Sequence, residues 1–377
     1  MSRTPTSLAA LIAQSTDLLL QQDKEGFQLI HNQIVSASEF DELTGGVFDD
    51  SSPLLKSLAT NVQLALVYIT AANTFADADY AKTALLTINH LIHNHRTEQG
   101  LYSEQTSYDL TSIDVNTIKS ILDNSQWLAL KTYFGLNDSE EIVWHLLYRK
   151  MPLSDLPLQS GLHRKQAPLA LDGATQILQQ FIPPPHQSNT YQLSSNLELC
   201  ACLWLSALYL NQPSHAEAAT HLVDRLKAKE SINEESLWTL VLLLRLSYEW
   251  SDNDFELLSK IPQADTFIPT DILASHVNKQ SQIGWTINDE KPANLLTSLI
   301  SNCETVVVIE GPAFAIRQWL QMTNNYFNPK LWVFAKPSDS PAQATLYRNN
   351  GSVEVITNMN ELVDLIGQTY HPSALLG

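Results

Sequence analysis

The chain has few basic residues, few cysteines and no long uninterrupted run of apolar residues. Its 377 residues include 22 Lys and Arg against 40 Asp and Glu, which gives a formal net charge of −18. Nucleic acids and anionic membrane surfaces are therefore not expected as partners, because both attract basic patches. Lys and Arg are scattered, without a run that would act as a local exception. Any partner is expected to be neutral or basic.

The shortage of apolar runs and of cysteine bears on location. The most apolar stretch, residues 237–246, is too short to span a bilayer and contains Arg245. The first residues lack the apolar core and the cleavage site of an export signal. The three cysteines, an odd number, fit a reducing cytoplasm. Cys200 and Cys202 are two apart in an apolar helix, so core packing is expected rather than a redox pair or a zinc site.

A short glycine-aromatic phrase is present twice. Residues 44–49 read Thr-Gly-Gly-Val-Phe-Asp, and residues 98–103 read Glu-Gln-Gly-Leu-Tyr-Ser. Each phrase closes a helix-like stretch, and most of two helices fit between them. This arrangement is typical of stacked helical hairpins that carry a loop at one rim of each hairpin.

Apolar periodicity predicts mainly helices before residue 300. Residues 151–190, which are rich in proline, are predicted to form a long connection with at most one helix, at 171–181. Asp114 or Ser112 is the expected N-cap of a short helix. The other predicted helices span residues 7–22, 24–37, 53–75, 79–95, 114–122, 125–135, 139–148, 195–210, 214–228, 233–250 and 252–260.

In the last part of the chain, the spacing of apolar residues changes from that of a helix to that of a strand. Residues 304–310 form a continuous β-branched run that predicts a buried strand, and Pro312 opens a helix through residue 327. Further strands are expected at 330–335 and 352–356, and a closing helix at 360–366. The order strand, helix, strand predicts a small parallel α/β unit. We therefore expect a helical domain over residues 1–300 and an α/β unit over 301–377.

Four segments, in this order, resemble one known family. Residues 40–48 resemble an aromatic-Asp-His-Leu-Gly-Gly-Gly-Phe motif, and residues 100–103 resemble part of Gly-Gly-Phe-Tyr-Ser-Ala. Asn196 matches the Asn of a Trp-Asn pair, and residues 306–312 resemble a valine-rich strand with its Gly-Asp/Pro turn. On these motifs the chain resembles the YyaL/spermatogenesis-associated protein 20 family, which joins a thioredoxin domain to a six-hairpin toroid. The resemblance implies an incomplete α/α toroid, six-hairpin glycosidase-like.

Several positions depart from the family pattern. No cysteine precedes Cys200, so the thioredoxin domain is expected to be absent. Glu42 stands where the family has His, and Ser195 replaces the Trp of the Trp-Asn pair. Residues 188–189 are Ser-Asn where paired Asp residues would stand. Acidic and redox positions are lost together, which implies a degenerate member of the family.

Carboxylates around the glycine phrases are the candidates for catalysis, because toroid glycosidases need two carboxyl groups that flank the sugar bond. The competing interpretation, which we favour, is that these are solvated loop acids in a chain with 40 acidic residues. Asp49, Asp50 and Glu104 are the catalytic candidates. The rim acids as a whole are Asp41, Glu42, Asp49, Asp50, Glu98 and Glu104.

Aromatic and histidine side chains give weaker signals. Phe48, Tyr102 and Asn196 are candidate ligand-binding residues. Together with Trp127, Trp204, Trp238 and Trp250, the two aromatics would either line a sugar-stacking cavity or pack between helices. His90 and His93 share a helix face whereas His95 does not, so a solvated helix end is expected rather than a metal site. No metal or cofactor is expected.

Taken together, the sequence predicts a mainly α protein, an incomplete α/α toroid with a small C-terminal α/β unit. The expected function is a non-catalytic binding or scaffold module, toward a thioredoxin-like partner or a carbohydrate-like ligand. The alternative is a carbohydrate-active enzyme, a glycosidase or sugar epimerase, that uses the rim carboxylates. A thiol-dependent redox protein is the third hypothesis, and the spacing of the cysteines disfavours it.

Overall fold

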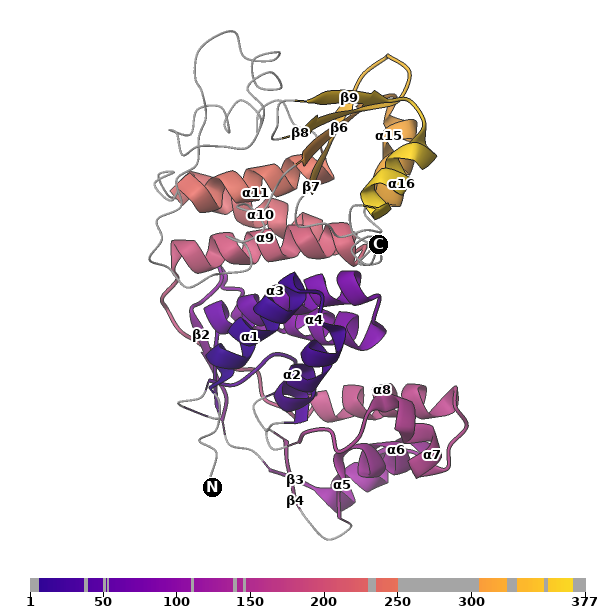
Figure 1. Ribbon diagram of the computed structural model, residues 1–377. Helices are drawn as coiled ribbons and strands as arrows, with labels where there is room; N and C mark the ends of the chain where they lie inside the picture. The colour runs from indigo at the N-terminus through magenta and orange to yellow at the C-terminus, as the bar shows by residue number, and fades with distance from the viewer. Residues whose placement is uncertain are drawn as a thin grey trace. The chain divides into compact units, whose positions relative to one another are not determined.

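The chain divides into two compact units. The computed structural model describes residues 7–36, 40–49, 52, 54–109, 112–137, 141–144, 147–229, 235–249, 305–323, 331–348 and 352–368. One unit contains Met1–Tyr68 and Lys82–Ser195, and the other contains Ile69–Ala81 and Asn196–Gly377. The protein is mainly helical, with a small sheet region (Figure 1).

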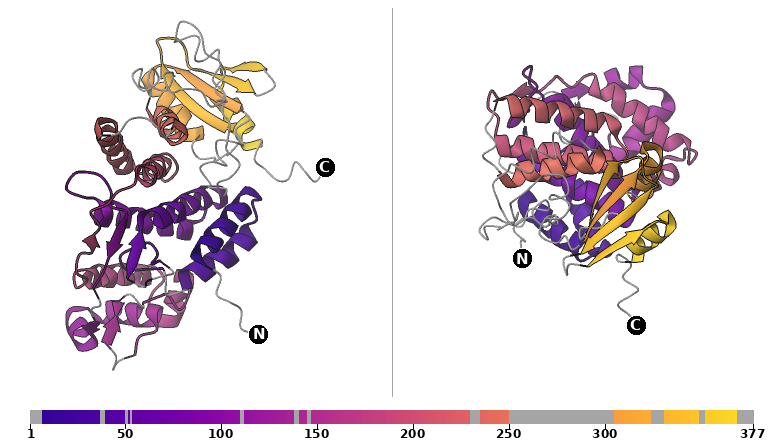
Figure 2. Two further views of the ribbon diagram at one scale, coloured as in Figure 1. Left: turned by 90° about the vertical axis from the view of Figure 1, so that its left-hand side faces the viewer. Right: turned by 90° about the horizontal axis from the view of Figure 1, so that it is seen from above.

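The first unit begins with two helices that lie side by side, α1 (Leu8–Leu20) and α2 (Lys24–Ser36) (Figure 2). The Ser7 hydroxyl caps α1 by accepting from the Ala10 amide. Helix α3 (Leu58–Phe75) follows, and its residues up to Tyr68 belong to this unit. Helix α4 (Ala78–His90), which belongs to this unit from Lys82 on, continues directly into a π-helical turn, Leu91–His95.

A group of four helices makes the rest of the first unit: α5 (Val115–Ile121), α6 (Asn124–Phe134), α7 (Leu156–Ser160) and α8 (Gln166–Gln179). Asp114 caps α5, as predicted, by accepting from the Thr117 amide. A capping box of Asp123 and Gln126 starts α6. The core of this group includes Ile118, Leu130, Phe134, Leu156, Leu171 and Leu178, all of them buried.

Short strands tie the loops of this unit together. β1 (Leu55–Ser57), β2 (Gln105–Ser107) and β5 (His186–Gln187) form an antiparallel sheet in the order β1-β2-β5. β3 (Ser112–Asp114) pairs antiparallel with β4 (Glu141–Val143). The first sheet places both glycine phrases near strand ends, which is where the candidate site forms.

The second unit contains α9 (Leu193–Tyr209), α10 (Pro213–Lys229) and α11 (Glu235–Tyr248), although α9 starts three residues before the unit does. Cys200 and Cys202 are both buried in α9, which confirms the expectation of core packing. Trp204 and Trp238 are buried as well.

The sheet of the second unit has the order β7-β6-β8-β9. β6 (Thr305–Gly311) pairs parallel with β7 (Leu331–Pro337) and antiparallel with β8 (Gln343–Arg348), and β8 pairs antiparallel with β9 (Val353–Ile356). Helices α15 (Ala313–Thr323) and α16 (Met359–Gln368) pack on one face through Val307, Ile309 and Leu346 (Figure 1). The predicted strand–helix–strand unit is confirmed, whereas β8 was not predicted.

Three predictions for the first unit are wrong. The helix predicted at 53–75 begins only at Leu58, because residues 55–57 pair with β2 as strand β1. Residues 139–148 were predicted as a helix, but residues 141–143 form β4, because Ile142 is buried in strand pairing with β3. The connection 151–190 holds two helices rather than at most one. Pro168 lies in the first turn of α8, where a proline removes no intrahelical hydrogen bond, so it does not break the helix.

Some predictions fall outside the described residues. These are the border between residues 300 and 301, the helix at 252–260, Asp50 and Trp250. Closure of the helical hairpins into a toroid stays a prediction. Among the helices that the structure describes, none combines the length and the apolar character needed to cross a membrane.

Candidate functional site

The first glycine phrase forms a tight, buried loop between α2 and β1. Phe40 and Val47 face each other in an antiparallel bridge, and the Asp41 amide donates to the Gly46 carbonyl over 2.8 Å. Gly45 and Gly46 have φ values of 82° and 78°, the left-handed region that favours glycine. A Cβ on Gly45 would collide with the Leu86 carbonyl oxygen. The two glycines therefore allow the loop to lie directly on α4.

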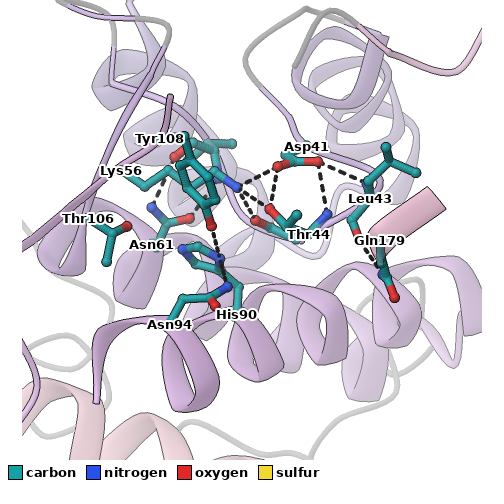
Figure 3. Close-up of polar contacts among 12 residues, drawn as sticks. Asp41, Leu43, Thr44, Lys56, Asn61, His90, Asn94, Thr106, Tyr108 and Gln179 are labelled. Atoms are coloured by element: carbon teal, nitrogen blue, oxygen red, sulfur yellow. Dashed lines mark hydrogen bonds and ion pairs between the residues drawn. The ribbon is translucent and has the colours of Figure 1, made fainter. Parts of the chain in front are cut away.

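A buried ion pair lies beneath this loop (Figure 3). The Lys56 ammonium donates to Asp41 Oδ2 over 2.7 Å, and their side chains are 0% and 1% exposed. Lys56 Nζ also donates to Thr44 Oγ1 over 2.8 Å and to the Gly45 carbonyl over 2.7 Å. An ammonium group has three N–H donors, so Lys56 is fully hydrogen-bonded within the protein.

The Asp41 carboxylate is engaged just as completely. Its Oδ1 accepts from the Leu43 and Thr44 amides, both over 2.9 Å, and its Oδ2 accepts from the Thr44 hydroxyl and from Lys56. Asp41 was predicted to be a solvated loop acid. That prediction is wrong, because the local hydrogen bonds to the turn and the charge of Lys56 compensate for burial of the carboxylate.

Aromatic rings enclose the ammonium. Lys56 Nζ lies 4.5 Å from the centre of the Phe48 ring and 5.1 Å from that of Tyr108, distances at which the ring faces attract a cation. Trp144 packs against both rings. Burial lowers the pKa of Lys56, while the Asp41 charge and hydrogen bond raise it. Phe48, proposed from the sequence as a ligand-binding residue, is thus buried and packs against the ammonium of this ion pair.

Two histidines border the same network. The rings of His90 and His95 are 5.3 Å apart between centroids, and both are buried. The predicted solvated helix end is therefore wrong for these two residues, although His93 is exposed. The reason is the π-helical turn that follows His90: its wider winding brings residues five apart onto one side.

Hydrogen bonds orient the two rings. His90 Nδ1 accepts from the side-chain amide of Asn94 over 2.9 Å (Figure 3). His95 Nδ1 donates to the Ser103 carbonyl over 2.8 Å. Burial lowers the pKa of His95 to about 4, and the Lys56 charge contributes while the Ser103 carbonyl opposes. Burial, and then the charges of Lys56 and His95, hold the pKa of His90 well below its usual range. Both rings are neutral near pH 7.

A second buried polar chain joins α2 to the segment after β4. Arg149 Nη2 donates to His31 Nε2 over 2.7 Å, so the His31 proton lies on Nδ1 and is donated to the Tyr68 hydroxyl over 2.9 Å. Burial, followed by the Arg149 charge, lowers the pKa of His31 to about 3. Arg149 Nε also lies 3.5 Å from Glu42 Oε1. The prediction of a solvated acid is thus wrong for Glu42 too.

The candidates named from the sequence lie in several different elements, and their convergence on one point stays a prediction. Asp49 is half-buried and its amide donates to the Leu55 carbonyl, and Asp50 lies outside the described residues. Glu104 is half-buried, and its carboxylate accepts from the side-chain amide of Gln192. Tyr102 is buried in this unit, whereas Asn196 is buried in α9 of the other unit.

The structure brings together Asp41, Thr44, Lys56, His90 and Tyr108. The sequence analysis named two of these, Asp41 as a rim acid and His90 as part of a solvated helix end. Nothing in the periodicity of residues 55–57 marks Lys56 as buried; the one available signal was a lone cation directly before an apolar helix. Within the described part of the chain, no three His, Cys, Asp or Glu side chains gather in a way that would hold a metal ion.

Comparison with known proteins finds similarity to solved structures. No protein-family model matches the chain, and no curated protein matches it. A solved structure described as a novel alpha-amylase from Clostridium perfringens is similar over 62% of this chain and 77% of its own, with 13% identity and a TM-score of 0.24. At that TM-score we derive neither fold nor function from the similarity.

Proposed function

We propose that this protein is a non-catalytic, degenerate six-hairpin toroid protein that acts as a binding or scaffold module. The observation that carries the proposal is the saturation of the polar groups beneath the glycine loop. Every donor of Lys56 and both oxygens of Asp41 are engaged inside the protein. A group that serves as acid, base or nucleophile must reach a reacting atom, and both of these groups are already engaged by partners within the protein.

The same network supplies what a scaffold needs. It locks the loop of residues 40–49 onto α4, so the neighbouring surface is held in one conformation before a partner arrives. Asn61 adds to this by donating to the Val47 carbonyl and accepting from the Val47 amide. Rigidity of this kind reduces the entropy lost on association.

The proposed partner is a thioredoxin-fold protein, with a carbohydrate-like ligand as the other option. The motif resemblance points to a family that carries a thioredoxin domain on the same chain, and no cysteine precedes Cys200 here. Burial raises the thiol pKa of both Cys200 and Cys202, which disfavours the reactive thiolate. Redox chemistry is therefore not assigned to Cys200 or Cys202.

The test is isothermal titration calorimetry. The full chain is titrated with a purified thioredoxin and, separately, with a series of oligosaccharides. Saturable heat with the thioredoxin supports the proposed partner, and saturable heat with a sugar supports the other option. If both titrations stay at the heat of dilution, the binding proposal is contradicted. A cysteine-free variant should bind equally well, since no thiol of this chain is assigned a role.

The alternative, a carbohydrate-active enzyme, is favoured by one observation. Glu104 is a partly exposed carboxylate whose orientation is fixed by Gln192, as an acid or nucleophile in a glycosidase would require. The test is turnover of aryl glycosides and oligosaccharides by the full chain. Turnover that disappears in Glu104→Gln but persists in Glu98→Gln would establish the enzyme and overturn the non-catalytic proposal.

A further inference from the structure

Strand β9 is the outer strand of its sheet among the residues that the structure describes (Figure 1). It pairs antiparallel with β8 in one continuous register. Val353 and Val355 are 57% and 56% exposed, whereas Ile356 is buried in the core beneath α15 and α16. Because alternate side chains of a strand point to one face, the two valines share the face of the sheet that lies opposite to these helices.

The backbone groups of the two valines point away from β8. The Arg348 amide donates to the Ser352 carbonyl over 3.0 Å, which makes these two residues a hydrogen-bonded pair of the ladder. In an antiparallel ladder, hydrogen-bonded and non-hydrogen-bonded pairs alternate. Glu354 therefore bonds to β8, whereas the amides and carbonyls of Val353 and Val355 face outward. Within the described part of the chain, no other backbone hydrogen bond engages these outward groups.

An edge of this kind is completed by another strand, which supplies the missing donors and acceptors and covers the apolar side chains. The charge of this part of the chain does not select a charged peptide. Residues 305–377 contain four Lys and Arg and five Asp and Glu, a net charge of −1 out of the −18 of the whole chain. Glu354, the acid of β9, pairs with Arg348 over 2.7 Å. This region thus contributes little to the repulsion between two copies of an acidic protein.

The edge of β9 is complementary to itself. A two-fold axis perpendicular to the sheet sets each outward amide opposite an outward carbonyl of a second copy. Opposite residues share a face, so the axis passes through a residue of β9. An axis through Glu354 places two glutamates opposite each other, which is unfavourable. An axis through Val353 pairs β9 with residues that precede the strand. An axis through Val355 sets two valines opposite each other and uses the whole of β9.

We propose that β9 is an interface between two copies of this chain, which pair antiparallel about a two-fold axis at Val355. The two four-stranded sheets then join into one, and Val353 and Val355 of both copies form a continuous apolar row. The contact is short, so the dimer is weak and depends on protein concentration. None of these residues belongs to the Lys56 network, so the proposal does not depend on the function proposed above.

The first test is sedimentation velocity of the full chain from about 5 µM to about 500 µM, where a concentration-dependent dimer is expected. Val355→Pro removes an outward amide, and edge strands tolerate proline where the N–H faces solvent. The variant should therefore fold, as circular dichroism would verify, and should dimerise at least about tenfold more weakly. Phe314→Ser is the control. Phe314 is 77% exposed on α15, away from the sheet edge, and its removal should not change the association.

The second test measures the register with single cysteines, in a chain whose Cys200, Cys202 and Cys303 are changed to Ala. Val355→Cys places two thiols opposite each other, at a Cα separation of about 5.5 Å that allows a disulfide. Val353→Cys is the matched control, because its two copies lie more than about 10 Å apart in this register. With oxidised glutathione, the disulfide dimer of Val355→Cys should form at least about tenfold faster than that of Val353→Cys.

Several results would overturn the proposal. These are a parent chain that stays monomeric at every concentration, a Val355→Pro variant that dimerises as well as the parent, and equal rates of disulfide formation in the two cysteine variants. A loss of association in Phe314→Ser that equals the loss in Val355→Pro would overturn it too. A monomer that binds an unrelated extended peptide would assign the edge to another occupant, against the proposal. If Val355→Pro does not fold, the cysteine variants decide alone.

Discussion

The ammonium of Lys56 lies 2.7 Å from the carboxylate of Asp41, and both side chains are shielded from water. Removing one partner of such a pair leaves the other charge buried without compensation. We expect Lys56→Met to lower the free energy of unfolding by about 3–5 kcal/mol. The double variant Lys56→Met/Asp41→Asn should cost less than the sum of the two single changes, because no full charge then stays buried.

Urea unfolding followed by circular dichroism measures these differences. The exposed pair of Lys82 and Asp172, 3.8 Å apart, provides the matched control, and Lys82→Met should change stability by less than about 1 kcal/mol. An equal loss in Lys56→Met and Lys82→Met would show that the buried pair does not organise the loop.

Gly45 offers a test of the loop conformation. Gly45→Ala places a Cβ against the Leu86 carbonyl oxygen at a φ of 82°, so strain and a backbone collision add together. We expect a loss of more than about 3 kcal/mol. Gly161→Ala is the control, because Gly161 has a φ of 70° but nothing within 4 Å of the added Cβ, and strain alone costs about 1 kcal/mol. Thermal unfolding of both variants would show the difference directly, and equal midpoints would contradict the packing argument.

Local patterns were enough to predict the turn but not the network below it. The repeated phrase marked Gly45, Gly46 and Gly100 as turn residues, and all three have positive φ. Lys56 and Asp41 are 15 residues apart, and only the tertiary fold shows that a lysine in the short strand β1 is buried. A polar residue type predicts exposure on average, so such an ion pair is missed whenever its partner is not adjacent in sequence.

The π-helical turn explains the other main difference. With regular helical spacing, His95 lies away from His90; a single wider turn at Leu91–His95 reverses this. Pro168 led to a wrong prediction for a related reason. A proline predicts a break in a helix except in the first turn, and the apolar pattern did not show that α8 starts at Gln166. The valine run of β6, in contrast, carried its own signal and was found at nearly the predicted bounds.

The thiols of α9 give a simple prediction. Cys200 and Cys202 are fully buried, and burial raises the pKa of each thiol, so both should resist a thiol reagent at pH 8 in the folded protein. Peptide mapping after labelling should find both unmodified in buffer and both modified in urea. Rapid labelling of either cysteine in the folded chain would contradict their place in the core.

The buried histidines predict that stability falls in mild acid. His31 and His95 have pKa values of about 3 and about 4 in the folded protein, against the ordinary value of 6.5. Between these values and pH 6.5 the unfolded chain binds protons that the folded chain does not. The free energy of unfolding therefore has its full value above about pH 6.5. Below that pH it decreases, by about 2 kcal/mol per histidine at pH 5.

Variants separate the histidines from the many carboxylates that also titrate in acid. His31→Gln and His95→Asn should each flatten the fall in urea midpoint between pH 7 and pH 5, because each removes one proton that only the unfolded chain takes up. The exposed His93 is the control, and His93→Gln should leave the pH profile of the parent protein unchanged. The opposite result would be full pH dependence in His95→Asn and reduced pH dependence in His93→Gln. It would contradict the burial of His95 beside His90 by the π-helical turn.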